Sequence, residues 1–439
     1  MHHNHKDRVQ QEDRYQDRVK IVEVSPRDGL QNIPSFIPTA TKIELIRRLA
    51  ATGLSTIEIA SVVSPRAVPQ LRDWRRILGD ASIKRLLEIS GDGDGDGDGD
   101  DPGMESSSAS TPSSSLSSSS PTITTTNSRP SDSDLDSENE DESENKSKRK
   151  LNLPILLPNL KGLTLALSHT PKIDNISLFL AATEPFSNSN TNCTVAEGLS
   201  RAISVAHAAS NQGVKHIRAY VSCVFRDPIT TEPTPHSTVL QCTRHLLDSG
   251  IDEIALSDTD GSGTPVLTVS LLSHLLSHDI PVEKLACHFH DTQGLAVQNV
   301  WAAYELGVRV FDGSVAGLGG CPFAPGARGN VDTLSLVRLF EGRRIRTGID
   351  EGRLAEVGGW VKGVLEEYQN KDEDVVRERK GETTGELEEK SAANAGEENK
   401  QGSSGRSRTI ATVTSTSSST TRAGEYCGWT FSRPLGIER

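Results

Sequence analysis

The chain has 439 residues and a formal net charge of −13 at pH 7. This acidic balance argues against a nucleic-acid-binding surface and against a polybasic membrane anchor. Hydrophobic residues make up 34% of the chain and aromatic residues 4%, so we expect part of the chain to contribute nothing to a packed core. No apolar run approaches the length of a membrane span, which predicts a soluble protein without a membrane partner.

The N-terminal segment and the cysteines bear on the compartment. Residues 1–18 are assigned to an N-terminal extension that contains several acidic residues, whereas a mitochondrial transit peptide is Arg-rich and poor in acids. The six cysteines form no CxxC pair and are expected to be reduced thiols of an intracellular protein. We therefore expect a cytoplasmic protein, with the mitochondrion as the alternative.

Short apolar runs rich in β-branched residues recur from residue 19 onward and predict eight strands. In chain order they are RVKIVEV, TIEIA, PILLP, NISLFLA, HIRAYVSCVF, EIALSD, KLACHFHD and RVFDGSV. Stretches with helical spacing of apolar residues alternate with these runs. This rhythm predicts a (β/α)8 TIM barrel built from residues 19–78 and 151–370. An open doubly wound sheet is the alternative, although no GxGxxG motif follows the first strand.

Two segments carry too few large apolar side chains to offset the entropy of ordering. Residues 79–150 contain a Gly-Asp repeat and a Ser-rich tract, and we expect a long disordered insert there. Residues 371–439 are expected to form a disordered, low-complexity tail. The insert falls between the second helix and the third strand, on the barrel's N-terminal face, whereas active sites in this fold lie on the opposite face.

Polar residues at the carboxyl ends of the predicted strands are expected to point into one site. Arg27 and Asp28 follow the first strand directly. Glu58 belongs to the second strand and Asp258 ends the sixth. An ordinary turn around Arg27 and Asp28 is the alternative interpretation, because their neighbours are turn-forming residues.

The strongest local signal is the HFHD stretch of the seventh strand. His288 and His290 are two residues apart, so their side chains point to the same face while Phe289 packs outward. Together with Asp28 on the first strand, they predict an open site for Mg²⁺ or Mn²⁺. Asn330 could supply a further oxygen ligand. The alternative is that both histidines are satisfied core residues.

A glycine-rich stretch, GLGGCPFAPGARGN, follows the eighth strand. Its glycines would let it close as a lid and carry Cys321 over the site. A flexible loop with a chance cysteine is the alternative.

Several of these stretches resemble one known family. VSPRDGLQ, SVVSPRAVPQ, CHFHDTQG and SVAGLGGCPFAPGARGN look like motifs of the 3-hydroxy-3-methylglutaryl-CoA lyases, a metallolyase branch of the TIM barrels. The resemblance runs from residue 19 to residue 368, apart from the insert. It implies cleavage of an acyl-CoA substrate to acetyl-CoA and acetoacetate, as in leucine catabolism and ketone-body formation, and a homodimer is compatible with the sequence.

The resemblance also assigns roles to individual residues. It implies that the cation is bound by Asp28, His288, His290 and Asn330. The implied catalytic residues are Arg27, Glu58, Asp258, His288 and Cys321. Among them, Arg27 would polarise the thioester carbonyl and Cys321 would carry a proton. Arg27 and Asn192 are expected to contact the substrate.

Some positions depart from the family pattern. Arg226 and Asp227 stand where a Gly-Cys pair is usual, and Asp260 replaces an apolar residue. Arg328 replaces a small residue and Leu334 an acidic one. These departures motivate one alternative, a catalytically weak barrel that serves as an interaction protein. A related acyl-CoA aldolase or Claisen synthase on another substrate is the second alternative.

Overall fold

The computed structural model describes residues 17–91, 151–170, 172–319 and 329–371. These residues belong to one compact unit formed by Met1–Asp92 and Lys150–Arg439. Most of the predicted insert and tail, together with Cys321 and Arg328 of the predicted lid, lies outside the described residues. In the described part of the chain, no helix is long and apolar enough to cross a membrane.

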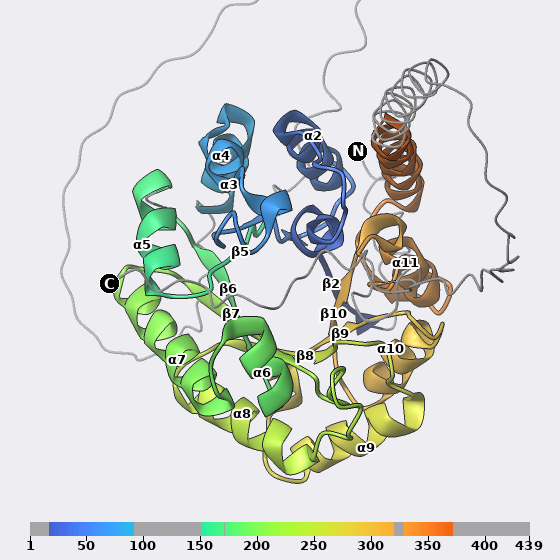
Figure 1. Cartoon of the computed structure of the whole chain (residues 1–439). Helices are drawn as coiled ribbons and strands as arrows, with labels where there is room; N and C mark the ends of the chain where they lie inside the picture. The colour runs from blue at the N-terminus through green and yellow to red at the C-terminus, as the bar shows by residue number, and fades with distance from the viewer. Residues whose placement is uncertain (1–16, 92–150, 171, 320–328, 372–439) are drawn as a thin grey trace, which may run out of the picture. The chain divides into compact units, whose positions relative to one another are not determined.

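Parallel strands form a closed barrel at the centre of this unit (Figure 1). They are β2 (Lys20–Glu23), β3 (Thr56–Ile57), β4 (Ala60–Ser61), β5 (Ile155–Leu156), β6 (Asn175–Ala181), β7 (His216–Ser222), β8 (Glu253–Asp258), β9 (Leu285–Phe289) and β10 (Val310–Gly313). β3 and β4 are two halves of one interrupted strand, since only two residues separate them. β3 pairs with β2 and β4 pairs with β5, so this strand closes the cylinder. The closure confirms the TIM barrel and contradicts an open sheet, which would leave two edges.

Helices surround the barrel and cover its outer face (Figure 1). They are α2 (Thr39–Ala50), α3 (Trp74–Gly79), α4 (Ala81–Gly91), α5 (Leu160–His169), α6 (Glu184–Thr191), α7 (Val195–Asn211), α8 (His236–Asp248), α9 (Pro265–Leu276), α10 (Ala296–Glu305), α11 (Thr333–Glu341) and a last helix over 351–371. Short turns are η1 (Ser25–Gly29), η2 (Pro69–Leu71), η3 (Val282–Lys284) and η4 (Val315–Gly317). Each strand is thus followed by helix, as the alternating pattern predicts.

Helix α4 lies within the segment assigned to the disordered insert. Ile83 of this helix is fully buried, and Leu86 and Leu87 pack against the main core. Asp80 accepts hydrogen bonds from the backbone N–H groups of Ser82 and Ile83, which stabilises the first turn. The boundary predicted at residue 79 is therefore too early, because this apolar face anchors residues 81–91 on the barrel.

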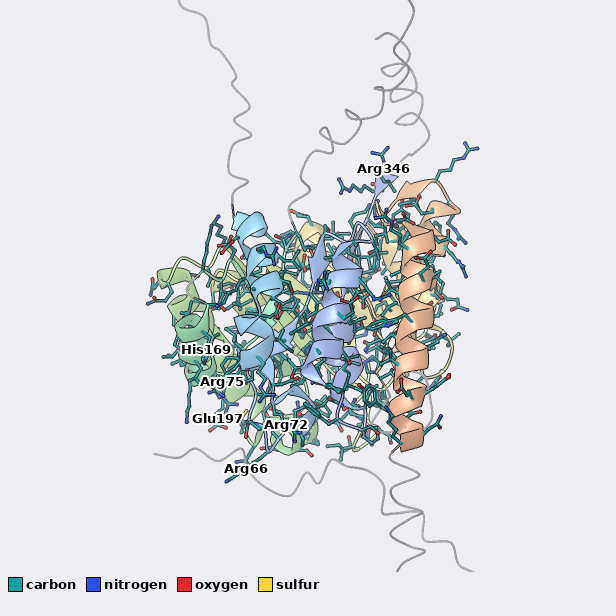
Figure 2. All side chains as sticks on the ribbon, turned by 90° about the horizontal axis from the view of Figure 1, so that it is seen from above. Arg66, Arg72, Arg75, His169, Glu197 and Arg346 are labelled. Carbon is teal, nitrogen blue, oxygen red and sulfur yellow. The ribbon has the colours of Figure 1, made fainter. Side chains whose placement is uncertain are left out.

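The N-terminal extension also ends in ordered structure. β1 (Asp17–Arg18) pairs in parallel with β11 (Ile345–Arg346), which follows α11. Figure 2 shows Arg346 of β11 and Arg66, which follows β4, at opposite ends of the barrel. The strands run from the end marked by Arg346 toward the end marked by Arg66, where their polar carboxyl ends meet.

A small apolar layer occupies part of the barrel interior. Leu156, Tyr220, Ala255 and Ala286 are buried together there, with Phe179 and Val310 packed against them. The alanines on β8 and β9 leave room for the large ring of Tyr220 on β7. This layer forms the floor on which the polar residues of the candidate site rest.

Candidate active site

Arg27 and Asp28 lie on η1, a π-helical turn that directly follows the first barrel strand. The backbone N–H groups of Asp28 and Gly29 both donate to the carbonyl of Val24, at 2.8 and 3.2 Å. Such turns are frequent at functional sites because they redirect side chains that a strand or an α-helix would place elsewhere. This wide turn explains how two adjacent charged residues both reach the barrel mouth.

Asp28, His288 and His290 come together as a group that could hold a metal ion. Each offers one ligand atom, and these atoms lie within 4.8 Å of one another. Burial alone would raise the pKa of Asp28, but the charges of Arg27 and the two histidines lower it to about 2. Burial and the neighbouring His288 lower the pKa of His290 to about 4. At neutral pH the group therefore offers a carboxylate and a neutral imidazole, the forms that bind cations.

Asn330 is held beside this group by the segment that follows the predicted lid. Val331 donates its N–H to the carbonyl of Phe289, which pairs this segment with the end of β9. The Nδ2 atom of Asn330 donates to Asp28 Oδ2 at 2.8 Å and to the carbonyl of Leu318 at 3.1 Å. Since Nδ2 is used in both bonds, Oδ1 is left as the atom that could face a cation.

Arg27 is enclosed by acidic and aromatic side chains. Its Nε donates to Glu58 and its Nη1 lies 2.5 Å from Asp28 Oδ1. The guanidinium also lies over the ring of Tyr220, whose hydroxyl donates to Glu58 at 3.1 Å. Burial alone would lower the pKa of Arg27, but Glu58 and Asp28 raise it above its ordinary value. A permanent positive charge thus sits at the mouth of the barrel.

Sequence reasoning missed three residues around His288. Asp312 Oδ2 lies 3.0 Å from His288 Nδ1, and Arg218 Nη2 donates to Asp312 Oδ1 at 2.5 Å. The ring of Tyr220 packs edge-on against His288. The sequence did contain a signal for Arg218. Strands of a parallel barrel are normally near-continuous apolar runs, whereas HIRAYVS has an arginine in its middle.

Among the described residues, Asp258 and Asn192 form hydrogen bonds with residues outside the cation group. Asp258 accepts hydrogen bonds from the backbone N–H groups of Ser262 and Gly263, and burial raises its pKa to about 7. It therefore holds the loop that follows β8. Asn192 ends α6 in a left-handed conformation with an exposed side chain. None of the contacts described joins either residue to Asp28, so their predicted roles stay predictions.

Two of the departures from the family pattern pair with each other. Arg226 Nη2 lies 2.5 Å from Asp260 Oδ2, and Nε donates to the same oxygen at 2.8 Å. The charge of Asp260 opposes the lowering of the pKa of His290 that burial and His288 cause.

The other departures that the structure describes have structural partners. Asp227 accepts hydrogen bonds from the backbone of Phe186, Ile229 and Thr230 and so ties two loops together. Leu334 packs against the main core from α11, and nothing in the structure gives it the role of an acidic residue.

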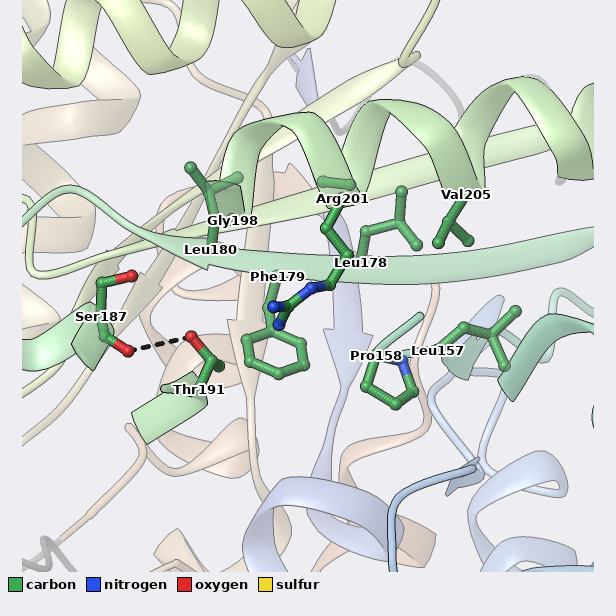
Figure 3. A pocket seen from close by; sticks show the side chains of 11 residues that line it. Leu157, Pro158, Leu178, Phe179, Leu180, Ser187, Thr191, Gly198, Arg201 and Val205 are labelled. Carbon is green, nitrogen blue, oxygen red and sulfur yellow. Dashed lines mark hydrogen bonds between the residues drawn. The ribbon is translucent and has the colours of Figure 1, made fainter. Parts of the chain in front are cut away.

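A pocket also lies between β6 and α7 (Figure 3). Arg201, Ser187 and Thr191 contribute polar groups to its lining, and Thr191 Oγ1 donates to the carbonyl of Ser187 at 2.9 Å. The residues that line this pocket include none of the residues assigned to the site from the sequence. We therefore place the candidate active site at the cation group.

A TIM barrel with a candidate cation site and a buried arginine at the carboxyl ends of its strands has the layout of a metal-assisted barrel enzyme. Comparisons with known proteins narrow this class. The HMGL-like family model matches residues 130–361. The mitochondrial hydroxymethylglutaryl-CoA lyase of Arabidopsis thaliana is 36% identical over 343 residues, which span 78% of this chain and 58% of that relative.

Two further matches extend over most of the related protein. The mitochondrial hydroxymethylglutaryl-CoA lyase of Rattus norvegicus is 36% identical over 344 residues, which cover 78% of this chain and 85% of the relative. The structure of an HMG-CoA lyase from Acinetobacter baumannii in complex with coenzyme A and 3-methylmalate is 31% identical, with a TM-score of 0.60. The match covers 80% of this chain and 92% of that one. The chain therefore belongs to the hydroxymethylglutaryl-CoA lyase family of enzymes.

Proposed function

We propose that this chain cleaves 3-hydroxy-3-methylglutaryl-CoA into acetyl-CoA and acetoacetate. The observation that carries the proposal is the group formed by Asp28, His288 and His290 beside the guanidinium of Arg27. The names of the relatives support this reaction. Coenzyme A in the structure of a relative supports an acyl-CoA substrate.

The proposed cation is Mg²⁺ or Mn²⁺, held by Asp28, His288, His290 and Asn330. Two imidazoles with oxygen ligands suit such ions. The buried Nδ1 of His290 has no hydrogen-bond partner among the described residues, which is consistent with a ring that awaits a ligand. When bound, the cation lowers the pKa of the substrate hydroxyl that it coordinates.

Arg27 is assigned the role of stabilising the negative charge that develops on the substrate. Once a base takes the proton of the 3-hydroxyl, that oxygen becomes a carbonyl and the neighbouring carbon–carbon bond breaks. Its electron pair moves to the thioester, which becomes an enolate. Arginine keeps its positive charge throughout and can donate to the enolate oxygen. Glu58 and Asp28 fix its Nε and Nη1, so Nη2 is the donor assigned to the substrate.

The remaining roles rest on the resemblance. Cys321 is proposed to return a proton to the enolate carbon, which completes acetyl-CoA. Asp258 is proposed to support the site and Asn192 to contact the substrate. Since Cys321 lies outside the described residues, its role depends on the motif that carries it.

The test is acetoacetate release from 3-hydroxy-3-methylglutaryl-CoA by the purified chain with Mg²⁺ or Mn²⁺. Arg27→Lys and Cys321→Ser should each lower kcat by about a hundredfold or more, because each removes a group that acts in the bond-breaking or protonation step. Cys242→Ser is the matched control, since Cys242 is a buried thiol on helix α8. A folded wild type that binds Mn²⁺ yet releases no acetoacetate would refute the lyase and direct the search to other 3-hydroxyacyl-CoA thioesters.

For the compartment we propose the cytosol, with the mitochondrion as the alternative. The names of the relatives point to the mitochondrion, so cell fractionation distinguishes the two. A homodimer is the proposed assembly, and sedimentation of the purified chain tests it.

A further inference from the structure

A series of ion pairs, buried except at Lys20, crosses the barrel interior beneath the cation group. Lys20 Nζ lies 2.8 Å from Glu253 Oε2, and Glu253 Oε1 lies 3.2 Å from Arg218 Nε. Arg218 Nη2 lies 2.5 Å from Asp312 Oδ1, and Asp312 Oδ2 lies 3.0 Å from His288 Nδ1. The series therefore ends on one ring nitrogen of a proposed cation ligand.

The members nearest the cation group are deeply buried. Asp312 is 2% exposed, Arg218 3% and His288 6%. A carboxylate in such surroundings is costly unless it is paired and hydrogen-bonded. Arg218, which keeps its positive charge in a protein, supplies that pairing. An ionised Asp312 can only accept hydrogen bonds, so His288 Nδ1 must carry the proton between them.

The proton on Nδ1 decides which nitrogen of His288 is free. In a neutral imidazole one nitrogen donates and the other keeps a lone pair. With Nδ1 donating to Asp312, the lone pair lies on Nε2, which is 3.9 Å from Asp28 Oδ2. His290 differs, because its buried Nδ1 has no hydrogen-bond partner among the described residues. Only one histidine of the pair is thus fixed by a carboxylate in the described contacts.

The ring of Tyr220 restrains the orientation of His288 as well. The two rings pack edge to face with centroids 5.5 Å apart and an interplanar angle of 82°. The guanidinium of Arg218 lies over the same tyrosine, 4.9 Å from its centroid. Arg218 therefore contacts both the carboxylate that orients His288 and the ring that packs against it.

We propose that Asp312, held by Arg218, is the positioning residue of the cation site and presets His288 as a ligand through Nε2. The inference rests on the proposed function, since it concerns the same site. Carboxylates that orient a metal-binding histidine typically contribute ten- to hundredfold in metal affinity. His288 would then hold its binding geometry before the cation arrives.

The experiment measures Mn²⁺ binding to chelator-stripped full-length chain, by the electron paramagnetic resonance signal of free Mn²⁺. Asp312→Asn should weaken binding about ten- to hundredfold, because the amide keeps the size of the side chain but loses the charge. The matched control is Asp252→Asn. Asp252 Oδ2 lies 3.7 Å from His216 Nδ1 in a half-exposed pair at the start of β7, so this change should leave Mn²⁺ affinity unaltered.

A second readout follows the tautomer directly. The ¹⁵N signals of labelled His288, assigned by comparison with His288→Gln, should show a protonated Nδ1 in the metal-free wild type and a mixture of tautomers in Asp312→Asn. If Asp312→Asn does not fold, Arg218→Lys replaces it, because lysine keeps the charge but loses the planar contact with Asp312.

Unchanged Mn²⁺ affinity with an unchanged His288 spectrum in the variant would overturn the inference. If the wild type itself binds no Mn²⁺, the proposed function fails, and the tautomer comparison still decides the role of Asp312.

Discussion

Asp28 combines two roles at the scale of single residues, as a proposed cation ligand and as a partner of Arg27. Its carboxylate is held between the guanidinium and the amide of Asn330. The charges around it outweigh the cost of burial and bring its pKa to about 2, from an ordinary value of 3.8. Ionised Asp28 therefore stabilises the fold at neutral pH even without a cation.

This stabilisation has a predictable pH dependence. A carboxyl whose pKa is lower in the folded state contributes above its unfolded pKa and loses that contribution as the pH falls through the folded pKa. In metal-free protein, Asp28→Asn should lower the free energy of unfolding by about 2 kcal/mol at pH 7. The difference from wild type should shrink between about pH 4 and pH 2. Denaturant titrations at pH 7 and pH 3 measure it, and a difference independent of pH would contradict this account.

Some site residues could be predicted from the sequence alone and others could not. Arg27, Asp28, His288 and His290 stand directly at strand ends, where spacing and residue type point to one site. Asp312 stands inside a barrel strand, and its partner is set by the register between strands, which a single sequence does not reveal. Arg218 could be recognised as an unusual charged residue within the predicted strand, but its contact with Asp312 depends on packing across the barrel.

At the scale of elements, the turn η1 and the segment after η4 meet at the cation group. Gly319 has a φ of +104°, and a Cβ added there would lie 2.5 Å from Asn330 Nδ2 and near the backbone of Asp28. This close approach needs glycine for space as well as for conformation. The segment can therefore hold Asn330 against Asp28 only while residue 319 lacks a side chain.

Gly319→Ala should accordingly weaken Mn²⁺ binding by about tenfold, the lower limit for losing a residue that orients a ligand. Gly213→Ala is the matched control, since Gly213 has a φ of +83° and no atom within 4 Å of an added Cβ. Gly213→Ala should lower the free energy of unfolding by about 1 kcal/mol, the penalty of a left-handed alanine. Gly319→Ala should lower it further, because the added Cβ also meets Asn330. Binding isotherms measure the effect of each variant on Mn²⁺ affinity, and denaturant titrations measure its effect on stability. If Gly319→Ala and Gly213→Ala bind Mn²⁺ with equal affinity, Gly319 does not support the site.

At the scale of the whole molecule, the barrel was predictable because its strands and helices repeat with distinct hydrophobic periods. Closure of the barrel through the interrupted strand β3–β4 was not predictable from the sequence. It depends on tertiary pairing, because β3 pairs with β2 whereas β4 pairs with β5. Helix α4 was missed because it continues directly into a polar tract. The average composition of residues 79–150 is polar, so it does not reveal the short apolar face of α4 that contains Ile83.

The position of the insert leads to a prediction for the whole chain. In a (β/α)8 barrel a helix ends and the next strand begins at the amino ends of the strands, so α4 ends and β5 begins on the side opposite the cation group. Replacing residues 93–149 with a flexible Gly-Ser linker of about twelve residues should leave Mn²⁺ affinity and acetoacetate release unchanged. Weaker binding or slower release in the shortened chain would mean that the insert contributes to the site.

The most direct test of the central claim is acetoacetate release by chelator-stripped protein while Mn²⁺ is restored stepwise. The account predicts no release without the cation, a rise that follows bound Mn²⁺, and saturation near one ion per chain. His290→Ala should bind less Mn²⁺ and release acetoacetate in proportion to what it binds. Full release from the stripped wild type, or saturation with Mn²⁺ without any release, would contradict a metal-assisted lyase.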